Sequence, residues 1–86
     1  MVASGWYMKK LHGGKYQSGL PDFVAFHKVH GTRWIEMKAP GGRLRQSQCE
    51  QFAKMSEYGV EVYVLEDEKD YDKLFREQGN WRYYRR

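Results

Sequence analysis

A strand–turn–strand pattern over residues 22–38 constrains the fold of this chain more than any other feature. Residues 22–29 have apolar side chains on both alternating faces, which is typical of a strand buried in the middle of a sheet. Gly31 and Thr32 are predicted to turn the chain, and residues 33–38 are predicted to return as a second strand. The pattern therefore predicts an antiparallel hairpin.

This hairpin brings two carboxylates and a lysine to one place. Asp22 begins the first strand, and Glu36 and Lys38 lie at the end of the second. Because side chains alternate along a strand, Glu36 and Lys38 share a face and Met37 lies on the opposite one. By themselves, Glu36 and Lys38 are also compatible with a salt bridge on an exposed sheet face. Asp22 at the same end of the hairpin favours an active site instead.

These residues are suited to binding a divalent metal ion. Two carboxylates at close range repel each other unless a cation lies between them. Mg²⁺ prefers oxygen ligands, usually one or two carboxylates together with water and substrate phosphate. We expect Asp22 and Glu36, with the backbone carbonyl of Met37, to bind Mg²⁺ or Mn²⁺ as the cofactor. Lys38 is then placed to orient water or to stabilise charge on a phosphate.

The order of these residues resembles a nuclease superfamily. Pro21-Asp22, followed after a hairpin by Glu36-x-Lys38, is similar to the PD-(D/E)xK nucleases, and their VRR-NUC branch is the closer match. The resemblance covers roughly residues 5–65. The residues that carry it are Gly19-x-Pro21-Asp22, the run Ile35-Glu36-Met37-Lys38-Ala39-Pro40-Gly41-Gly42-Arg43-Leu44, and Gln48, which opens the next helix.

The resemblance implies a function and a set of catalytic residues. It implies a metal-dependent, structure-selective endonuclease that hydrolyses DNA phosphodiesters, with branched DNA such as Holliday junctions or flaps as the substrate. Asp22, Glu36, Lys38 and Gln48 would be its catalytic residues. By the same resemblance the protein would act as a homodimer.

The chain also departs from the family pattern. VRR-NUC and related nucleases usually carry an upstream helix with a glutamate that helps to bind metal, whereas this chain has no acidic residue before Asp22. The helix has been lost, another group replaces the glutamate, or fewer protein ligands hold the metal. An alternative function is therefore a non-catalytic nucleic-acid-binding module that retains the nuclease fold.

The rest of the chain predicts one small α/β domain over residues 1–86. A helix is predicted over 46–58, a strand over 60–65 that lies parallel to the second hairpin strand, and a short helix over 70–78. A short strand is predicted near the N-terminus, over 5–11. We expect a restriction-endonuclease-like core in which helices flank a mixed β-sheet.

Basic residues near the motif are candidates for binding nucleic acid. The net charge is +4, a mild excess that is compatible with a DNA partner. The candidates for contacting the DNA backbone are Lys9, Lys10, His12, Lys15, Arg43 and Arg45. The aromatic and basic tail, 81–86, either clamps single-stranded nucleic acid or docks on a partner subunit, and the sequence leaves both readings open.

The remaining composition bounds the setting of the protein. Cys49 is the only cysteine, so a disulfide within one chain is excluded, and an intracellular location is expected, in the cytoplasm of a bacterial or virus-infected cell. No apolar run approaches the roughly 20 residues of a membrane span, so no membrane partner is expected. The acidic residues 66–68 precede the last predicted helix and are expected to favour its N-terminus.

Overall fold

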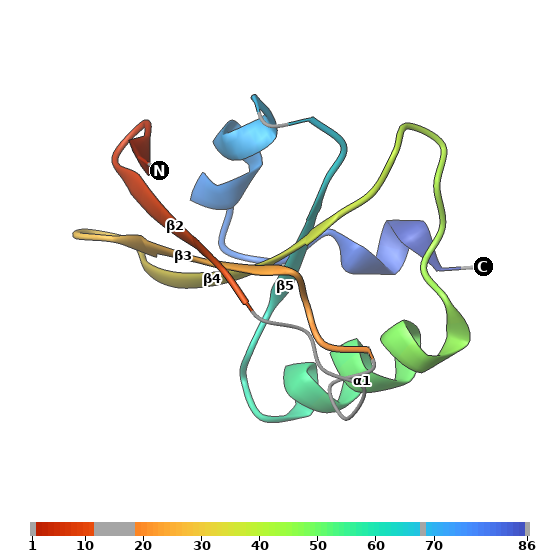
Figure 1. Ribbon diagram of the computed structural model, residues 1–86. Helices are drawn as coiled ribbons and strands as arrows, with labels where there is room; N and C mark the ends of the chain where they lie inside the picture. Colours follow the sequence, from red (N-terminus) through yellow and green to blue (C-terminus); the bar gives the residue numbers. More distant parts are fainter. Residues whose placement is uncertain (1, 12–18, 68, 86) are drawn as a thin grey trace.

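The computed structural model describes residues 2–11, 19–67 and 69–85, which form a mixed five-stranded sheet with helices on both faces (Figure 1). The strand order is β1-β2-β3-β4-β5, and only β4 and β5 are parallel. The elements are β1 (Val2–Ala3), β2 (Trp6–Lys10), β3 (Phe23–His27), β4 (Gly31–Met37), α1 (Gln46–Glu57), β5 (Val62–Leu65) and the 3₁₀ helices η1 (Asp70–Phe75) and η2 (Trp81–Tyr84). The predicted α/β class with a mixed sheet is confirmed.

The predicted hairpin forms between β3 and β4. Phe23 faces Ile35 across the two antiparallel strands, so Asp22 lies opposite Glu36. Strand β2 adds to the other side of β3, and β5 adds to the other side of β4 in parallel. The hairpin therefore occupies the middle of the sheet, as its apolar composition indicates.

The turn of the hairpin lies earlier than the sequence predicts. It falls at residues 28–30, and residues 31–32 already belong to β4. The Nδ1 atom of His27 accepts hydrogen bonds from the backbone N–H groups of Val29 and His30, at 3.0 and 3.2 Å. A side chain that caps its own turn in this way competes with continued strand pairing.

Each face of the sheet packs into its own apolar cluster. In Figure 1 the sheet is seen nearly edge-on, with η1 on one side and α1 on the other. The cluster on the η1 side contains Trp6, Ala25, Ile35, Tyr63, Leu65 and Leu74. The cluster on the α1 side contains Leu44, Phe52, Val62, Val64 and Trp81. Strand β5 contributes buried residues to both clusters, and β4 contributes Ile35 to the η1-side cluster and the half-buried Trp34 to the α1-side cluster. Such two-sided burial is expected for parallel strands that have helices on both faces of the sheet.

The elements after β4 agree with the predictions in type, with one exception. Helix α1 ends one residue before the predicted end, and Gly59 follows it with a φ of 81°, which suits a helix-terminating glycine. The predicted helix over 70–78 forms only the short 3₁₀ helix η1. The Tyr63 hydroxyl donates a hydrogen bond to the carbonyl of Arg76, where the backbone is already extended. This contact holds the backbone at Arg76 in an extended conformation, so the helix ends before this residue.

The aromatic tail packs on its own chain. Trp81 is buried, and its ring meets the ring of Phe52 edge-on at a centroid separation of 6.1 Å. The carbonyl of Tyr84 accepts a hydrogen bond of 2.8 Å from the N–H of Leu44. Tyr83 is the exception, because 84% of its surface is exposed. The tail therefore closes the α1-side cluster.

Among the described residues, the helices are all too short or too polar to cross a membrane.

Candidate active site

The hairpin brings the predicted acidic and basic residues together. Asp22 precedes β3, Glu36 lies near the end of β4, and Lys38 follows that strand directly. The carboxylate Oδ2 of Asp22 accepts a hydrogen bond of 3.3 Å from the backbone N–H of Met37. The Nζ atom of Lys38 lies 3.6 Å from Oε2 of Glu36. Three charged side chains thus converge at one end of the β3–β4 pair.

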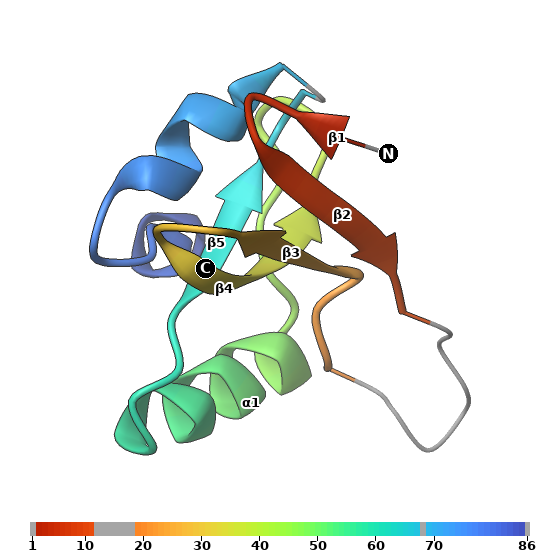
Figure 2. The same ribbon diagram turned by 90° about the vertical axis from the view of Figure 1, so that its left-hand side faces the viewer.

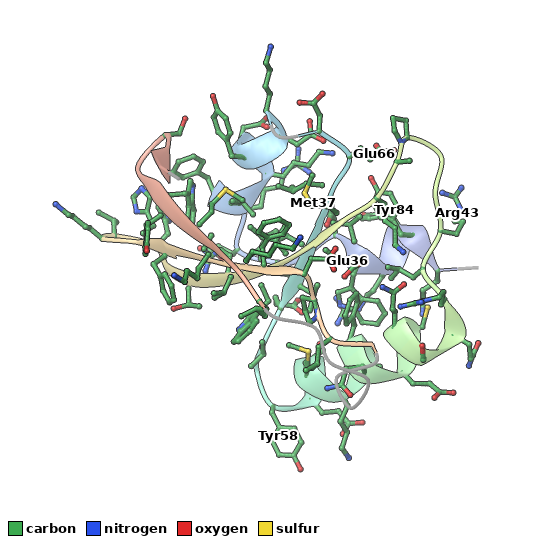
Figure 3. All side chains as sticks on the ribbon, in the orientation of Figure 1. Glu36, Met37, Arg43, Tyr58, Glu66 and Tyr84 are labelled. Carbon is green, nitrogen blue, oxygen red and sulfur yellow. The ribbon has the colours of Figure 1, made fainter. Side chains whose placement is uncertain are left out.

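Met37 lies on the other face of β4 from this cluster. Figure 3 shows Met37 toward the η1 side and Glu36 toward the α1 side. The Met37 side chain packs against the apolar cluster on the η1 side. Its backbone remains at the site, because its N–H is bonded to Asp22. The alternation predicted from the sequence is therefore observed.

Glu36 is a buried carboxylate with one oxygen left over. Only 3% of the residue is exposed. Its Oε2 accepts a hydrogen bond of 2.7 Å from Nε2 of Gln48, whereas Oε1 has no hydrogen-bond partner among the described residues. Buried polar atoms are nearly always paired, so an unpaired carboxylate oxygen indicates a place for another ligand.

Electrostatics at Glu36 favour a positive ligand. Burial raises the pKa of the Glu36 carboxyl, and the nearby charge of Asp22 raises it further. The hydrogen bond from Gln48 and the charge of Lys38 lower the pKa of Glu36 but do not cancel the rise. A cation between the two carboxylates would offset both the cost of burying the charged Glu36 carboxylate and its repulsion from Asp22. The unpaired oxygen and the two carboxylates therefore fit a hard divalent cation.

Gln48 joins the site to the start of α1. It lies in the first turn of α1, and only 2% of the residue is exposed. Its Oε1 accepts a hydrogen bond of 2.9 Å from the backbone N–H of Arg45, which satisfies one of the free donors at the helix start. Its Nε2 bonds Glu36. Without the family resemblance, the sequence pattern predicts that Gln48 lies on the surface. Its burial is seen only in the folded structure.

Gly19 explains the glycine of the motif before Asp22. It is buried and has a φ of 88°, a backbone conformation that favours glycine. A Cβ atom at Gly19 would lie 2.9 Å from the carbonyl oxygen of Ser47 and 3.3 Å from the Cβ of Gln51. Only a glycine allows the segment that leads to Asp22 to lie this close to the first turns of α1.

Glu66 and Tyr84, which the sequence did not indicate as site residues, hold the loop after Lys38. The backbone N–H of Lys38 donates to the carbonyl of Leu65 at 2.9 Å, which fixes the start of the loop. Further along, the N–H of Gly41 donates to Glu66 Oε2 at 3.1 Å, and the hydroxyl of Tyr84 donates to Glu66 Oε1 at the same distance. Figure 3 shows Glu66 and Tyr84 beside this loop. Glu66 was expected only to favour a helix start.

The basic candidates on β2 lie beside the start of β3. Lys9 and Lys10 are exposed, and Lys10 faces Phe23 across the β2–β3 pair. The N–H of Leu11 donates to the carbonyl of Asp22 at 2.8 Å, so this end of β2 is fixed next to the site.

The other basic candidates lie on the far side of the site or outside the described part of the chain. Arg43 and Arg45 are exposed in the segment between Lys38 and α1. Arg45 also caps α1 through its contact with Gln48. His12 and Lys15 lie outside the described residues.

In the described ranges 2–11, 19–67 and 69–85, no group of three or more His, Cys, Asp or Glu side chains gathers as a metal site. Asp22 and Glu36 are the two carboxylates that lie close together at the end of the hairpin. The third expected metal ligand is the backbone carbonyl of Met37, which is not a side chain and therefore does not belong to such a group.

The family model described as the VRR-NUC domain matches residues 7–69. This match covers most of the chain: it begins within β2 and includes the β3–β4 hairpin, α1 and β5. A search of curated proteins and a search of solved structures each gave no match.

Proposed function

The chain belongs to the VRR-NUC family, a nuclease-type family of the PD-(D/E)xK superfamily, and from this premise we propose that it is a metal-dependent, structure-selective DNA endonuclease. The observation that carries the proposal is the convergence of Asp22, Glu36 and Lys38 at one end of the β3–β4 hairpin. The reaction is the hydrolysis of a DNA phosphodiester.

Asp22 and Glu36, with the backbone carbonyl of Met37, would hold Mg²⁺ or Mn²⁺. The unpaired Oε1 of Glu36 supports this assignment, as does the repulsion from Asp22 that raises the pKa of the Glu36 carboxyl. When bound, such a cation supplies an activated water and neutralises charge that develops on the phosphate.

The proposed role of Lys38 is to position the attacking water. Its ammonium is partly buried, with 19% of the side chain exposed, and lies 3.6 Å from Glu36 Oε2. It can donate a hydrogen bond to the attacking water or to a phosphate oxygen and still remain beside the carboxylate. Gln48 acts through Glu36, because its amide fixes one carboxylate oxygen and directs the other toward the ligand.

The proposed substrate is branched DNA, a flap or a four-way junction, cut by a homodimer with two sites. The basic residues on the two sides of the site support a nucleic-acid partner. These are Lys9 and Lys10 on β2 and Arg43 and Arg45 before α1.

The test is cleavage of a labelled panel of duplex, single strand, flap and four-way junction with Mg²⁺ or Mn²⁺. We expect Lys38→Ala and Glu36→Gln to abolish cutting and to leave DNA binding largely intact. Lys28→Ala, which removes the same charge as Lys38→Ala from the exposed hairpin turn, is the matched control and retains activity. A Lys38→Ala variant that loses binding and cutting equally would make Lys38 a DNA-binding residue instead.

A second candidate function is a nucleic-acid-binding module without turnover. It is favoured by the low number of acidic ligands, since the described part of the chain offers two carboxylates to a metal rather than three. Calorimetric titration with Mg²⁺, alone and with DNA, separates the two functions. Metal binding that needs Glu36, together with cutting, supports the nuclease, and DNA binding without any metal response supports the binding module.

A further inference from the structure

A basic groove lies along the outer side of the edge strand β5. It encloses about 480 Å³ and is separate from the cluster around Glu36. Figure 2 shows the connection between η1 and η2, which forms part of its wall, passing outside β5. The groove is lined by Arg76, Gln78, Asn80, Arg82, Tyr83 and Arg85, with Gly79 at its floor, and no acidic side chain is among these lining residues of the described chain.

The floor of the groove is firmly held against β5. The amide of Asn80 pairs with both backbone groups of Val64, accepting from its N–H at 2.6 Å and donating to its carbonyl at 3.0 Å. Gly79 packs so closely on Val62 that a Cβ atom at this position would clash with the Val62 carbonyl oxygen. The groove is therefore a formed feature of the fold, and its residues are one strand removed from β4, which carries Glu36.

Arg82 is committed to the structure of the groove wall. Its guanidinium donates to Ser56 Oγ at 2.7 Å, pairs with Glu61 Oε1 at 3.4 Å, and lies 4.7 Å from the centre of the Trp81 ring. These contacts hold the side chain in one position. The carboxylate of Glu61 neutralises much of the Arg82 charge.

Arg76 and Arg85 leave charge available to a ligand. Both are exposed. Arg85 uses only Nε in a hydrogen bond, to the carbonyl of Arg82 at 3.2 Å, so its two terminal nitrogens have no partner in the parts of the chain that are described. The Arg76 guanidinium makes no hydrogen bond or ion pair within those same parts. An arginine fork matches the spacing of phosphate oxygens.

Tyr83 adds an exposed aromatic face to this charged groove. It is the most exposed of the large hydrophobic side chains in the described chain, at 84%. Arginine charge beside an exposed aromatic ring is the combination that binds single-stranded nucleic acid, because the charges contact the backbone and a base stacks on the ring. In a duplex the bases are already stacked on each other, so the ring favours an unpaired strand.

We propose that this groove binds an unpaired single strand of nucleic acid, with a base on Tyr83 and phosphates at Arg76 and Arg85. The choice of ligand rests on the proposed nuclease function. Among branched substrates, the groove then favours a flap, which has a free single-stranded arm, over a four-way junction, in which all arms are paired. The arm would lie beside β5 while the branch lies at the hairpin site.

The test measures binding of a labelled oligothymidine of about 15 nucleotides by fluorescence anisotropy, in EDTA to prevent metal-dependent cutting. We expect Tyr83→Ala to weaken binding by about tenfold, since one stacked base contributes on that order. We expect Arg76→Ala combined with Arg85→Ala to lower the slope of log affinity against log salt by about 1.4, the value for two lost phosphate contacts to a single strand.

The matched control is Lys28→Ala combined with Lys69→Ala, which removes two exposed charges away from the groove and leaves this salt slope unchanged. All the substituted side chains are exposed, and unchanged thermal unfolding verifies that each variant is folded. A competing duplex of the same length should bind more weakly to the wild type, and Tyr83→Ala should reduce that preference.

Wild-type binding by both groove variants would overturn the proposal. A changed oligomeric state with unchanged oligonucleotide binding would also overturn it and identify the groove as a contact between copies of the chain. Because the measurement is made without metal, its outcome is independent of cutting. A protein that binds through the groove and cuts no member of the DNA panel would refute the proposed nuclease and leave this inference intact.

Discussion

The Nε2 atom of Gln48 lies 2.7 Å from Oε2 of Glu36, and this contact joins α1 to β4 inside the protein. Both residues are almost fully buried, with 2% and 3% exposed. The same amide accepts a hydrogen bond from the N–H of Arg45 at the start of α1. One side chain thus links the beginning of a helix to the orientation of the buried carboxylate.

Replacement of Gln48 should therefore affect both stability and the site. Gln48→Ala leaves the Arg45 N–H without its partner and leaves Oε2 of Glu36 with only the Lys38 ammonium at 3.6 Å, which costs about 1–3 kcal/mol. We expect the free energy of unfolding in urea to fall by that amount and cleavage to slow. Gln46→Ala, on the exposed face of the same helix turn, should change the free energy of unfolding by less than about 0.5 kcal/mol. Equal effects of the two substitutions would contradict the structural role of Gln48.

The stability of the protein should respond to Mg²⁺ through Glu36. A metal that binds only the folded state raises the free energy of unfolding by about 1.4 kcal/mol at ten times its Kd. We expect this gain for the wild type, measured by thermal unfolding with increasing Mg²⁺. We expect Glu36→Gln to remove the gain, and Glu50→Gln on the exposed face of α1 to retain it. An identical response from Glu36→Gln would show that the metal binds elsewhere.

The stability contributed by Asp70 should depend on pH. The backbone N–H of Glu66, at 3.0 Å from Oδ2, holds the pKa of the Asp70 carboxyl below its usual value, and the Lys73 ammonium at 3.2 Å adds to this. A lowered pKa means that folding favours the charged form. The stabilisation is present above the ordinary carboxyl pKa of about 4 and is lost as the pH falls through the lower, folded-state pKa.

We therefore expect Asp70→Asn to lower the free energy of unfolding by roughly 1 kcal/mol at neutral pH, where a charged acceptor is replaced by a neutral one. The difference from the wild type should shrink as urea unfolding is repeated from pH 6 down to pH 3. Asp72→Asn removes the same charge from an exposed neighbour in η1 and serves as the control. A difference that stays constant over this pH range would exclude the ionised carboxylate as its cause.

Asn80 should be important for stability although it lies far from the hairpin site in sequence. Its amide satisfies both the N–H and the carbonyl of Val64 on the open edge of β5. Asn80→Ala leaves both groups without this partner, and we expect the free energy of unfolding to fall by about 1–3 kcal/mol. Gln78→Ala, an exposed amide in the same connection, should have little effect on that free energy. Chemical unfolding of both variants at one pH makes the comparison.

The geometry of the hairpin site could be predicted from local rules. Alternation along β4 places Glu36 and Met37 on opposite faces, and antiparallel pairing returns the chain to Asp22. Gly59 ends α1 because only its own backbone conformation is involved. These features need only residues that are close in sequence. The position of the turn was predicted wrongly, at residues 31–32. It lies at 28–30 because the His27 side chain accepts hydrogen bonds from the backbone there.

The buried face of α1 shows where such rules fail. The buried residues of α1 are the polar Gln48 and the apolar Phe52, whereas the apolar Ala53 is exposed. A polar amide is predicted to face solvent, and it is buried here because a carboxylate from β4 is present to accept its hydrogen bond. The position of that carboxylate is set by a different element.

The nuclease motif, the β3–β4 hairpin, the α/β class and the parallel placement of β5 could all be predicted from the amino-acid sequence, because each follows from periodicity, turn residues or an ordered set of side chains. The contact of Glu66 with the loop after Lys38, and the packing of Trp81 against Phe52, are known from the folded structure alone. The same holds for the basic groove outside β5. These contacts join residues that are far apart in the chain, and their free energy depends on which surfaces meet once the sheet has formed, which no local pattern encodes.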